Sequence, residues 1–434
     1  MTTPQQTSRR NPWLWVPSLY LAEGIPYAVV MTVSVILYKK MGIPNDQIAF
    51  YTSWLYLPWV IKPLWSPVVD ILRTKRLWII TTQLFVGAGL AGVALTLPLS
   101  GFFQWTIAIF WLMAFSSATH DIAADGFYML GLNEKQQAFF VGIRSTFYRI
   151  AMISAQGLLV MLAGFFETTD MFGLSGSIPA AWSITFFVLA GLFILFFAYH
   201  RFILPRPVVD QPKVTGTEAS SFFKEFLLTF VAFFKKENIG IGLAFLLFYR
   251  FGEAQLVKLA SPFMLDSRDA GGLGLTTTEV GFVYGTVGIA ALTLGGLLGG
   301  FAAARKGFKF WLWPMVVAIN VPDLVYVYLA YVQPDNYFII NLCVAFEQFG
   351  YGFGFTAYSL FMLYISQGKH STAHFALCTG FMALGMMIPG MFSGDIQKWL
   401  GYQNFFVWVC VATIPGFVVA KLAKVDPEFG KKGT

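Results

Sequence analysis

Apolar positions along the chain gather in long runs that are separated by short polar breaks such as "RTKR", "LNEKQQ" and "QPDN". Twelve runs are long enough to cross a hydrocarbon core of about 30 Å. They lie near 13–38, 48–70, 77–98, 104–131, 138–165, 181–204, 238–265, 277–303, 310–332, 337–366, 373–397 and 404–422. Spanning segments must satisfy their own backbone hydrogen bonds, and nothing alternates as in a membrane barrel. The pattern therefore predicts an all-α membrane protein with twelve transmembrane helices.

Composition and charge agree with this pattern and add an orientation. The 434 residues are 57% hydrophobic and 12% charged, against about 25% charged in soluble domains. The net charge of +7 would suggest nucleic acid in a soluble protein, but here its distribution matters more. If the N-terminus is cytoplasmic, 20 of the 29 Lys and Arg residues fall on the cytoplasmic side, and only Lys39, Lys40, Arg268 and Lys398 fall outside. We therefore expect a multi-pass inner-membrane protein with both termini in the cytoplasm and no nucleic-acid partner.

The longest hydrophilic stretch divides the spans into six plus six. It covers 205–221 and is followed by "FFKEFLLTFVAFFKK", which is typical of an amphipathic surface helix. We predict an N-terminal six-helix bundle over 1–204, a cytoplasmic linker over 205–237 and a C-terminal bundle over 238–434. This layout resembles the major facilitator superfamily, in which two pseudo-symmetric six-helix bundles surround a central cavity.

Charged residues inside the spans point to that cavity. A charge at mid-bilayer costs roughly 2.5–3.5 kcal/mol, so such a residue normally faces an interior. In the facilitator architecture spans 1, 4, 7 and 10 surround the cavity, and they carry Glu23, Asp121, Asp125, Arg250, Glu253, Lys258 and Glu347. Spans 2, 5 and 9 carry the exceptions Lys62, Arg144, Arg149 and Asp323. We predict that Glu23, Asp121, Asp125 and Glu347 are cavity acids.

The two aspartates in "SSATHDIAADGFYML" also have a structural interpretation. Spans 4 and 5 form a hairpin, in which Asp121 lies at the depth of Arg149 and Asp125 at that of Arg144. The aspartates are about 40° apart on their helix and the arginines about 140° apart on theirs, so one arginine can readily meet the acidic face and both less easily. We expect gating ion pairs here. Because two carboxylates one turn apart disfavour joint ionisation, either aspartate is also a candidate proton carrier.

Span 7 offers a substrate contact. Arg250 and Glu253 are three residues apart, so they either neutralise each other or leave Arg250 to bind an anionic group. Glu347 in "VAFEQFGYGFGFTAY" has no neighbouring base, which makes it a stronger cavity candidate than Glu253. The glycines at 350, 352 and 354 allow close helix packing or bending.

Aromatic and loop residues complete the candidate site. Four tyrosines on spans 1, 7 and 10 either stack on sugar rings or are packed aromatics: Tyr20, Tyr249, Tyr351 and Tyr358. After span 2, "SPVVDILRTKR" resembles the facilitator loop signature, and we assign Asp70 and Arg73 to structural gating. The histidines form no HExxH or His/Cys cluster, so neither a metal nor a cofactor is expected.

Six motifs, in order from span 1 to span 11, resemble the AmpG-type muropeptide permeases and, more distantly, the acetyl-CoA transporters grouped with them. They are "LYLAEGIPYAVV", "IKPLWSPVVD", "HDIAADGF", "YRFGEA", "FEQFGYGFGFTAY" and "STAHFALCTGFMALGMMIPGMFSG". His120 departs from the pattern, since the permeases often have Gln there.

The resemblance implies proton-driven import of anhydro-muropeptides, with Asp121 and Asp125 as essential acids. We also expect a monomer. Acetyl-CoA or another anionic metabolite is the alternative cargo. A membrane enzyme would need a catalytic cluster near one membrane face and a sizeable extramembrane loop, and neither is visible. A receptor of the same fold would bind its ligand without accumulating it.

Overall fold

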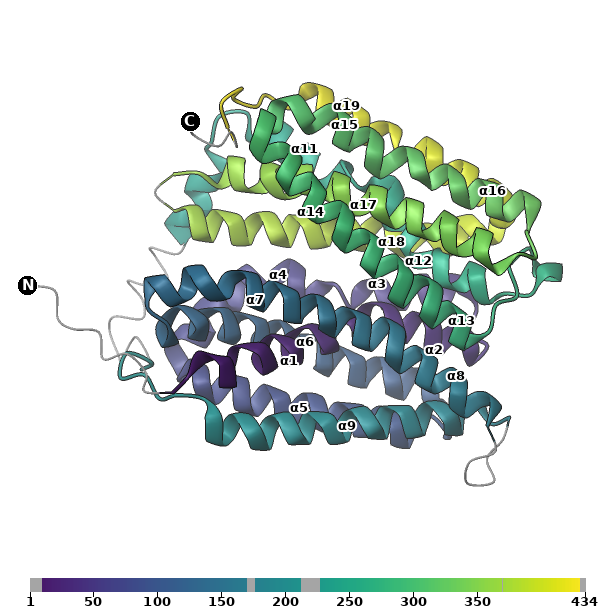
Figure 1. Cartoon of the computed structure of the whole chain (residues 1–434), viewed down its shortest axis with the longest axis horizontal. Helices are drawn as coiled ribbons and strands as arrows, with labels where there is room; N and C mark the ends of the chain where they lie inside the picture. The colour runs from purple at the N-terminus through teal and green to yellow at the C-terminus, as the bar shows by residue number, and fades with distance from the viewer. Residues whose placement is uncertain (1–9, 170–175, 212–226, 369, 430–434) are drawn as a thin grey trace, which may run out of the picture. The chain divides into compact units, whose positions relative to one another are not determined.

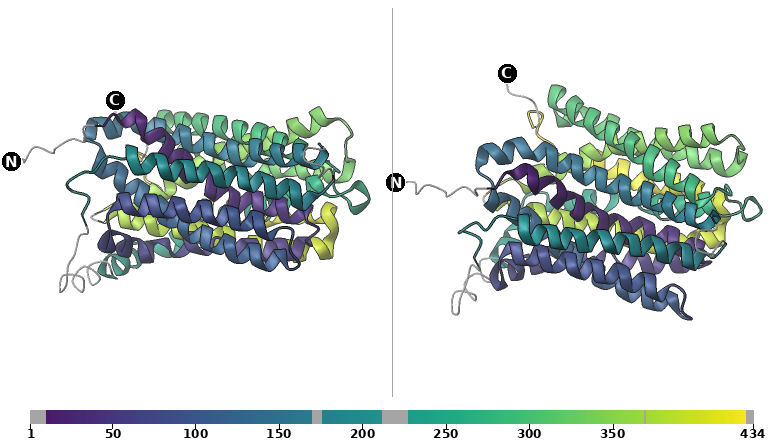
Figure 2. Two further views of the ribbon diagram at one scale, coloured as in Figure 1. Left: turned by 90° about the horizontal axis from the view of Figure 1, so that it is seen from below. Right: turned by 60° about the horizontal axis from the view of Figure 1, so that its bottom comes forward.

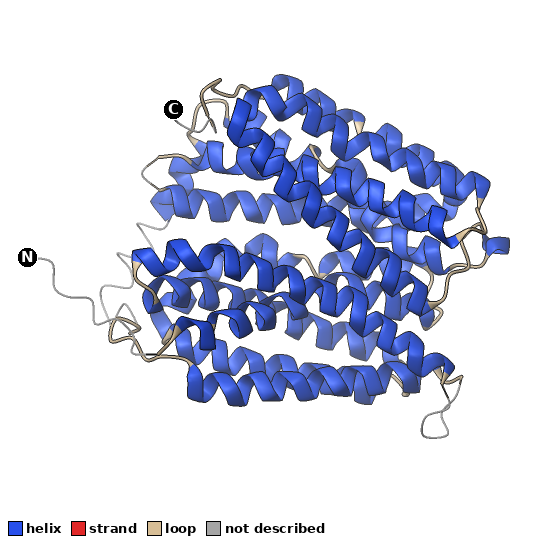
Figure 3. Ribbon diagram, in the orientation of Figure 1, coloured by secondary structure: helices blue, strands red, loops and turns tan. Residues whose placement is uncertain are grey.

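The computed structural model describes residues 10–169, 176–211, 227–368 and 370–429, and within these ranges it contains helices and no strand (Figure 3). This confirms the all-α prediction. Ten helices in the described ranges are long and apolar enough to cross a membrane. The chain is therefore a multi-pass membrane protein.

These ten helices contain eleven of the twelve predicted spans. The run Ser371–Leu422 holds the last two spans, and its backbone leaves helical geometry at Gly401, where φ is 70°. The span predicted over 48–70 is not among the ten, because it is divided into α3 (Asn45–Trp54) and α4 (Leu57–Leu72). The count of twelve transmembrane helices stays a prediction.

Contacts between Cα atoms divide the chain into two compact units. Unit 1 comprises Met1–Val33 and Leu64–Phe226, and unit 2 comprises Ser34–Pro63 and Leu227–Thr434. Two of the three crossings between the units fall within the first two predicted spans, so the segment from Ser34 to Pro63 packs with the C-terminal half of the chain. The predicted bundles over 1–204 and 238–434 stay a prediction.

Unit 1 is a set of helices that run alongside one another (Figures 1 and 2). Its elements are η1 (Pro12–Leu14), α1 (Val16–Ala28), the π-helical η2 (Val29–Val33), the end of α4, α5 (Lys75–Thr96), α6 (Phe102–Gly131), α7 (Glu134–Ile153), the π-helical η3 (Ser154–Leu159), α8 (Val160–Thr168) and α9 (Ile178–Ile203). α5 packs between α6 and α9.

Between α6 and α7 the chain turns at Asn133, whose side chain forms a capping box with Gln136. This turn is the hairpin that the "LNEKQQ" break predicts.

Unit 2 holds the remaining elements. They are α2 (Ser34–Lys40), α3, the start of α4, α11 (Ile239–Phe248), α12 (Phe251–Leu265), η4 (Arg268–Ala270), α13 (Thr277–Val280), the π-helical η5 (Gly281–Gly288), α14 (Ile289–Lys306), α15 (Phe308–Asn320), η6 (Val321–Asp323), α16 (Leu324–Val332), α17 (Tyr337–Ser366), α18 (Ser371–Ala412) and α19 (Ile414–Leu422). α17 packs against α14 and α15, and α18 packs against α12 and α3.

Three glycines let α17 approach two helices at once. A Cβ on Gly352 would lie 1.9 Å from the carbonyl oxygen of Leu292 on α14. On the opposite side, a Cβ on Gly350 would lie 2.3 Å from the carbonyl oxygen of Ala318 on α15, and one on Gly354 would also meet α15. The close packing predicted for this glycine run is confirmed.

The predicted amphipathic helix of the linker is described only in part. Residues 227–234 are helical, and the start of the segment lies outside the described residues. Phe233 is fully buried and stacks on Phe381 of α18 with ring centroids 6.5 Å apart. Lys236 donates to the carbonyl oxygens of Ile365 and Gln367 at the end of α17. This helix therefore belongs to unit 2 and packs there through Phe233.

Candidate functional site

In unit 1 an acid, a base and a phenol meet where α1, α6 and α7 pack together. Arg144 Nη1 lies 3.1 Å from Asp125 Oδ1, which forms an ion pair across the α6–α7 hairpin. The hydroxyl of Tyr20 on α1 donates to the same carboxylate oxygen at 3.0 Å and accepts from Arg144 Nη1 at 3.1 Å. The prediction that one arginine of span 5 meets the acidic face of span 4 is confirmed for Arg144 and Asp125.

Aromatic rings hold the guanidinium of Arg144 in place. Its Cζ lies 4.8 Å from the ring centroid of Tyr20 and 5.1 Å from that of Tyr128. The hydroxyl of Tyr128 in turn donates to the carbonyl oxygen of Gln137 at 2.5 Å, which ties this ring to α7. Cation–π contact of this kind favours a charged guanidinium where water is scarce. For Tyr20 the sequence left sugar stacking and plain packing open; in this structure its ring and hydroxyl contact the ion pair.

The other predicted acids of unit 1 lie close to this cluster along the chain. Asp121 is half-buried one helical turn before Asp125, and Glu23 is buried one turn after Tyr20. Gly24 lets α1 cross α7, because a Cβ there would lie 2.8 Å from the Cβ of Ala151. Arg149 is half-buried on α7, and its pairing with Asp121 stays a prediction.

His120, next to Asp121 in sequence, belongs to a buried hydrogen-bond chain. Gln83 Nε2 lies 3.0 Å from His120 Nε2, and Gln83 Oε1 lies 2.9 Å from His200 Nδ1. His200 Nε2 lies 2.9 Å from the Ser18 hydroxyl. With the amide as assigned, Gln83 donates to His120 and accepts from His200, so each contact suits a neutral imidazole. The sequence singled out His120 but not its partners on α5 and α9.

In unit 2 the predicted span 7 is interrupted at its charged residue. α11 ends before Tyr249, and Arg250 has φ −114° and ψ 25° as the N-cap of α12. The guanidinium of Arg250 lies 5.0 Å from the ring centroids of Tyr351 and Phe355 on α17, and it donates to the Tyr351 hydroxyl. Glu253 accepts no hydrogen bond from described residues, so the predicted same-helix pair with Arg250 does not form here. Arg250 is held by aromatic rings.

Tyr249 and Tyr358, for which the sequence left sugar stacking and plain packing open, make contacts beside the helix interruption. Tyr249 is fully buried, and its hydroxyl donates to the carbonyl oxygen of Gly354 at 2.9 Å. Tyr358 is 1% exposed, and its hydroxyl donates to the carbonyl oxygen of Leu246 at 2.6 Å. These contacts tie α11 to α17 and are structural. Tyr351 is half-buried and remains the more accessible ring of the three.

Glu253 and Glu347 were predicted as separate candidates, and the structure brings them together with a third acid. One carboxylate oxygen from each of Glu253, Asp323 and Glu347 lies within 4.8 Å of the other two, and all three residues are buried. Asp323 looked like an exception in the sequence because span 9 was not expected at the cavity. It reaches the cluster from η6, a 3-10 turn between α15 and α16 that contains Pro322. The periodic pattern gave no signal for this break, although Pro322 marks its position.

The predicted gating pair after span 2 is described only in part. Asp70 lies in the last turn of α4, and its side chain is outside the described part of the chain. Arg73 follows the end of α4 and is exposed. Their gating role stays a prediction.

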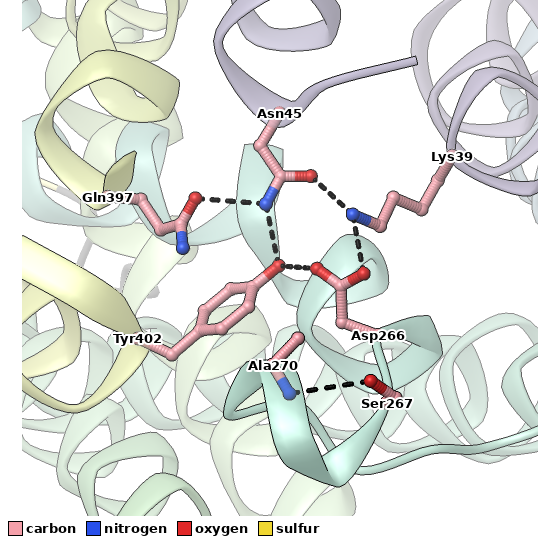
Figure 4. A network of polar contacts seen from close by, with 7 residues as sticks. All are labelled: Lys39, Asn45, Asp266, Ser267, Ala270, Gln397 and Tyr402. Carbon is pink, nitrogen blue, oxygen red and sulfur yellow. Dashed lines mark hydrogen bonds and ion pairs between the residues drawn. The ribbon is translucent and has the colours of Figure 1, made fainter. Parts of the chain in front are cut away.

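A polar network that the sequence did not predict joins α2 and α3 to α12 and α18 within unit 2 (Figure 4). Lys39 Nζ lies 2.6 Å from Asp266 Oδ1 and donates to Asn45 Oδ1 at 2.9 Å. Asn45 Nδ2 donates to the Tyr402 hydroxyl at 2.7 Å and to Gln397 Oε1 at 2.9 Å, and Tyr402 donates to Asp266 Oδ2 at 2.7 Å. The five side chains hold the segment from Ser34 to Pro63 against the C-terminal half of the chain.

A neighbouring ion pair reinforces this junction. Lys398 Nζ lies 2.7 Å from Asp46 Oδ2. The hydrogen bond from Lys398 lowers the pKa of the Asp46 carboxyl below its usual 3.8. Asp46 lies in the first turn of α3 and precedes the predicted span over 48–70.

Comparison with known proteins places these features in a family. The model of the Major Facilitator Superfamily matches residues 18–376. A Rickettsia conorii protein named as a transporter, AmpG 4, is 23% identical over 92% of this chain and 94% of its own length. The anhydromuropeptide permease of Escherichia coli K12 is 23% identical over 95% of this chain and 79% of its own length.

Solved structures share the fold at lower identity. The D-xylose-proton symporter has a TM-score of 0.71 and 12% identity, covering 94% of this chain and 96% of its own. The nucleoside transporter NupG has a TM-score of 0.66 and 15% identity, covering 96% of this chain and all of its own.

Proposed function

The chain belongs to the major facilitator superfamily, and from this premise we propose that it imports anhydro-muropeptides, fragments of the bacterial cell wall, across the inner membrane together with protons. The names of the curated relatives support this cargo, because one of them is an anhydromuropeptide permease aligned over most of both chains. In this proposal a monomer works by alternating access, with both termini in the cytoplasm.

One observation carries the proposal: the ion pair of Asp125 and Arg144 with Tyr20. The two charged side chains are 40% and 30% exposed, although they lie on helices long and apolar enough to cross a membrane. Charges that faced acyl chains would be costly, and intramembrane charges normally face a bundle interior or a water-filled cavity. An accessible ion pair at this position supports an aqueous pathway that reaches Asp125.

Protonation of this cluster provides the proposed coupling. A proton on Asp125 removes the negative charge that attracts Arg144, which releases the α6–α7 hairpin contact and the hydroxyl of Tyr20. Asp121, one turn away, offers a second carboxylate to which the proton can pass. A membrane potential contributes roughly 2.3 kcal/mol per charge per 100 mV, so one co-transported proton would drive useful accumulation.

In unit 2, Arg250 is the proposed contact for the substrate. A guanidinium binds a carboxylate through two parallel hydrogen bonds, and the peptide part of a muropeptide carries such groups. Its Nε is buried and has no hydrogen-bond partner among the described residues. The half-buried ring of Tyr351 lies against it and is proposed to stack on the sugar.

Uptake into proteoliposomes tests this function. Labelled anhydro-muropeptide should accumulate when the outside is made acidic, and unlabelled anhydro-muropeptide should compete better than acetyl-CoA. Asp125→Asn should abolish gradient-driven accumulation and keep substrate binding, whereas the exposed loop variant Asp269→Asn should transport normally. Binding without accumulation by the unmodified protein would indicate a receptor. Undiminished gradient-driven uptake by Asp125→Asn would refute the assigned proton route.

A further inference from the structure

The buried carboxylates of Glu253, Asp323 and Glu347 converge from three elements of unit 2. Glu253 lies near the start of α12, Asp323 ends η6, and Glu347 lies in the middle of α17. Their exposed fractions are 0%, 0% and 1%. Three acids so close together and so well shielded from water cannot all be ionised unless a positive charge lies between them. We infer that they bind a hard metal cation of the size of Na⁺ or Ca²⁺.

The hydrogen bonds that normally compensate buried carboxylates are missing for two of the three. Both oxygens of Glu253 and both oxygens of Asp323 lack a hydrogen-bond partner within the described ranges. Glu347 differs, since Gln348 Nε2 donates to its two oxygens at 3.3 and 3.0 Å. Arg250 is within electrostatic range of Glu253, but its guanidinium is oriented by the rings of α17. The unpaired oxygens are therefore available as ligands.

Two further residues, Tyr326 and Asn320, carry buried oxygen atoms without a hydrogen-bond partner among the described residues. The Tyr326 hydroxyl is fully buried, has no hydrogen-bond partner among described residues, and is within electrostatic range of all three acids. Asn320, one turn before Asp323, uses its amide nitrogen on the carbonyl oxygen of Val316 and leaves Oδ1 without a partner. A buried phenol that lacks a hydrogen-bond partner among the described residues and lies within electrostatic range of three carboxylates is an observation separate from the acidic cluster, and it supports a site built from oxygen ligands.

The spacing of the carboxylates is compatible with an ion of this size. Two ligands of one ion can be separated by no more than twice the metal–oxygen distance. For Ca²⁺ that distance is about 2.3–2.6 Å, and Na⁺ is similar in size, so oxygens within 4.8 Å of one another suit either ion. Mg²⁺ requires about 2.0–2.1 Å and retains its water molecules, which fits a dry cluster poorly. The absence of sulfur and imidazole ligands in this cluster also disfavours zinc.

Ion-dependent thermal stability of the purified full-length protein tests the site without any transport substrate, so this inference stands or fails separately from the proposed cargo. NaCl and CaCl₂ are titrated at constant ionic strength against choline chloride, with KCl and MgCl₂ as size controls. We expect a saturable rise of the melting temperature with Na⁺ or with Ca²⁺, and the two arms identify which ion binds. Glu253→Gln and Asp323→Asn should each raise the half-saturating ion concentration at least about tenfold. Glu23→Gln, a buried acid of unit 1, should leave the ion response unchanged.

The cation-free condition gives a second readout that does not depend on ion affinity. Without a cation, Asp323→Asn removes an uncompensated buried charge and should raise the melting temperature above that of the unmodified protein. A lower melting temperature for this variant, at normal elution in size-exclusion chromatography, would show that Asp323 is already compensated and would overturn the inference. The inference would also be overturned if neither Na⁺ nor Ca²⁺ raised the melting temperature. The same holds if both variants kept the ion response, or if K⁺ or Mg²⁺ gave the same response.

Discussion

Lys39 and Asp266 form an ion pair with a 2.6 Å separation between Nζ and Oδ1, which joins the end of α2 to the C-cap of α12 (Figure 4). The two side chains are only 15% and 20% exposed. Lys39 also donates to Asn45 Oδ1, and Asp266 Oδ2 also accepts from the Tyr402 hydroxyl. The chain between Ser34 and Pro63 thus belongs to unit 2 through polar contacts as well as through packing.

We expect Asp266→Asn to destabilise the protein by about 1.5–3 kcal/mol, because a partly buried hydrogen bond to a charged group is lost while Lys39 remains. Thermal unfolding in detergent measures the change. Asp335→Asn is the matched control: its ion pair with Arg268 has a similar 3.0 Å distance, but its carboxylate is 96% exposed, so the cost should be close to zero. Equal effects of the two substitutions would contradict the structural role given to Asp266.

Tyr20→Phe tests the bridge between Asp125 and Arg144. The variant keeps the ring under the guanidinium but removes the hydroxyl that contacts both charged groups. Since a hydrogen bond is worth about 0.5–1.5 kcal/mol, proton-driven uptake should fall between about twofold and tenfold while the protein stays folded. Tyr128→Phe, which removes a hydroxyl bonded to backbone, should preserve the pH dependence of uptake. If Tyr20→Phe left uptake unaltered at every pH, the hydroxyl would have no part in the coupling mechanism.

Gly352→Ala should destabilise unit 2 by about 1–3 kcal/mol or prevent folding, because the added Cβ would meet the backbone of Leu292 at 1.9 Å. Expression level and unfolding temperature report the effect. Gly300→Ala provides a control on α14, where a Cβ meets nothing within 4 Å. That substitution should be neutral or should stabilise by up to about 1 kcal/mol, since alanine favours a helix over glycine.

Gln83→Leu should destabilise the folded protein more than His120→Gln. The first leaves His120 and His200 with buried nitrogens that have lost their partner, at about 1–3 kcal/mol for each group. The second replaces the imidazole by an amide whose oxygen can still accept from Gln83 Nε2. Unfolding temperatures of the two variants give the order. The reverse order would indicate that His120 makes a contribution beyond this hydrogen bond.

Low pH should remove the stabilisation that the Asp46–Lys398 ion pair gives to the folded protein. The pKa of Asp46 in the folded protein lies below 3.8, so the pair stabilises the folded state at pH values above the unfolded pKa, and this stabilisation disappears as the pH falls through the folded pKa. Lys398→Met should therefore lower the unfolding temperature at pH 6, and the difference from the unmodified protein should disappear as the pH falls through the folded pKa of Asp46. Lys309→Met, which removes an exposed lysine elsewhere in unit 2, should show no such convergence.

The residues near one hairpin were predictable because the chain connects them directly. Asp125 and Arg144 lie at similar distances from the turn at Asn133, so helix geometry alone predicts that they are neighbours. The role of Tyr20 was not predictable in the same way. Its position depends on how α1 slides along α7, and that register is set by the approach of Gly24 to Ala151.

Other contacts depend on breaks in the helices. The interruption at Arg250 and the 3-10 turn ending at Asp323 bring side chains together from α11, α12, η6 and α17. A hydrophobic pattern identifies which segments are apolar enough to span a membrane, but it does not specify which distant spans touch. For that reason the six-plus-six pattern gave no indication that the segment from Ser34 to Pro63 packs with the C-terminal half.

The π-helical turns η2 and η3 lie against each other within unit 1. A π turn holds one more residue than an α turn, so excising a single residue from either stretch would restore the ordinary repeat and leave the facing of the flanking helix nearly unchanged. The same deletion in an ordinary α-helical stretch would rotate the flanking helix by ~100°. Homologues that are one residue shorter in these helices should therefore carry the deletion at Val29–Val33 or Ser154–Leu159.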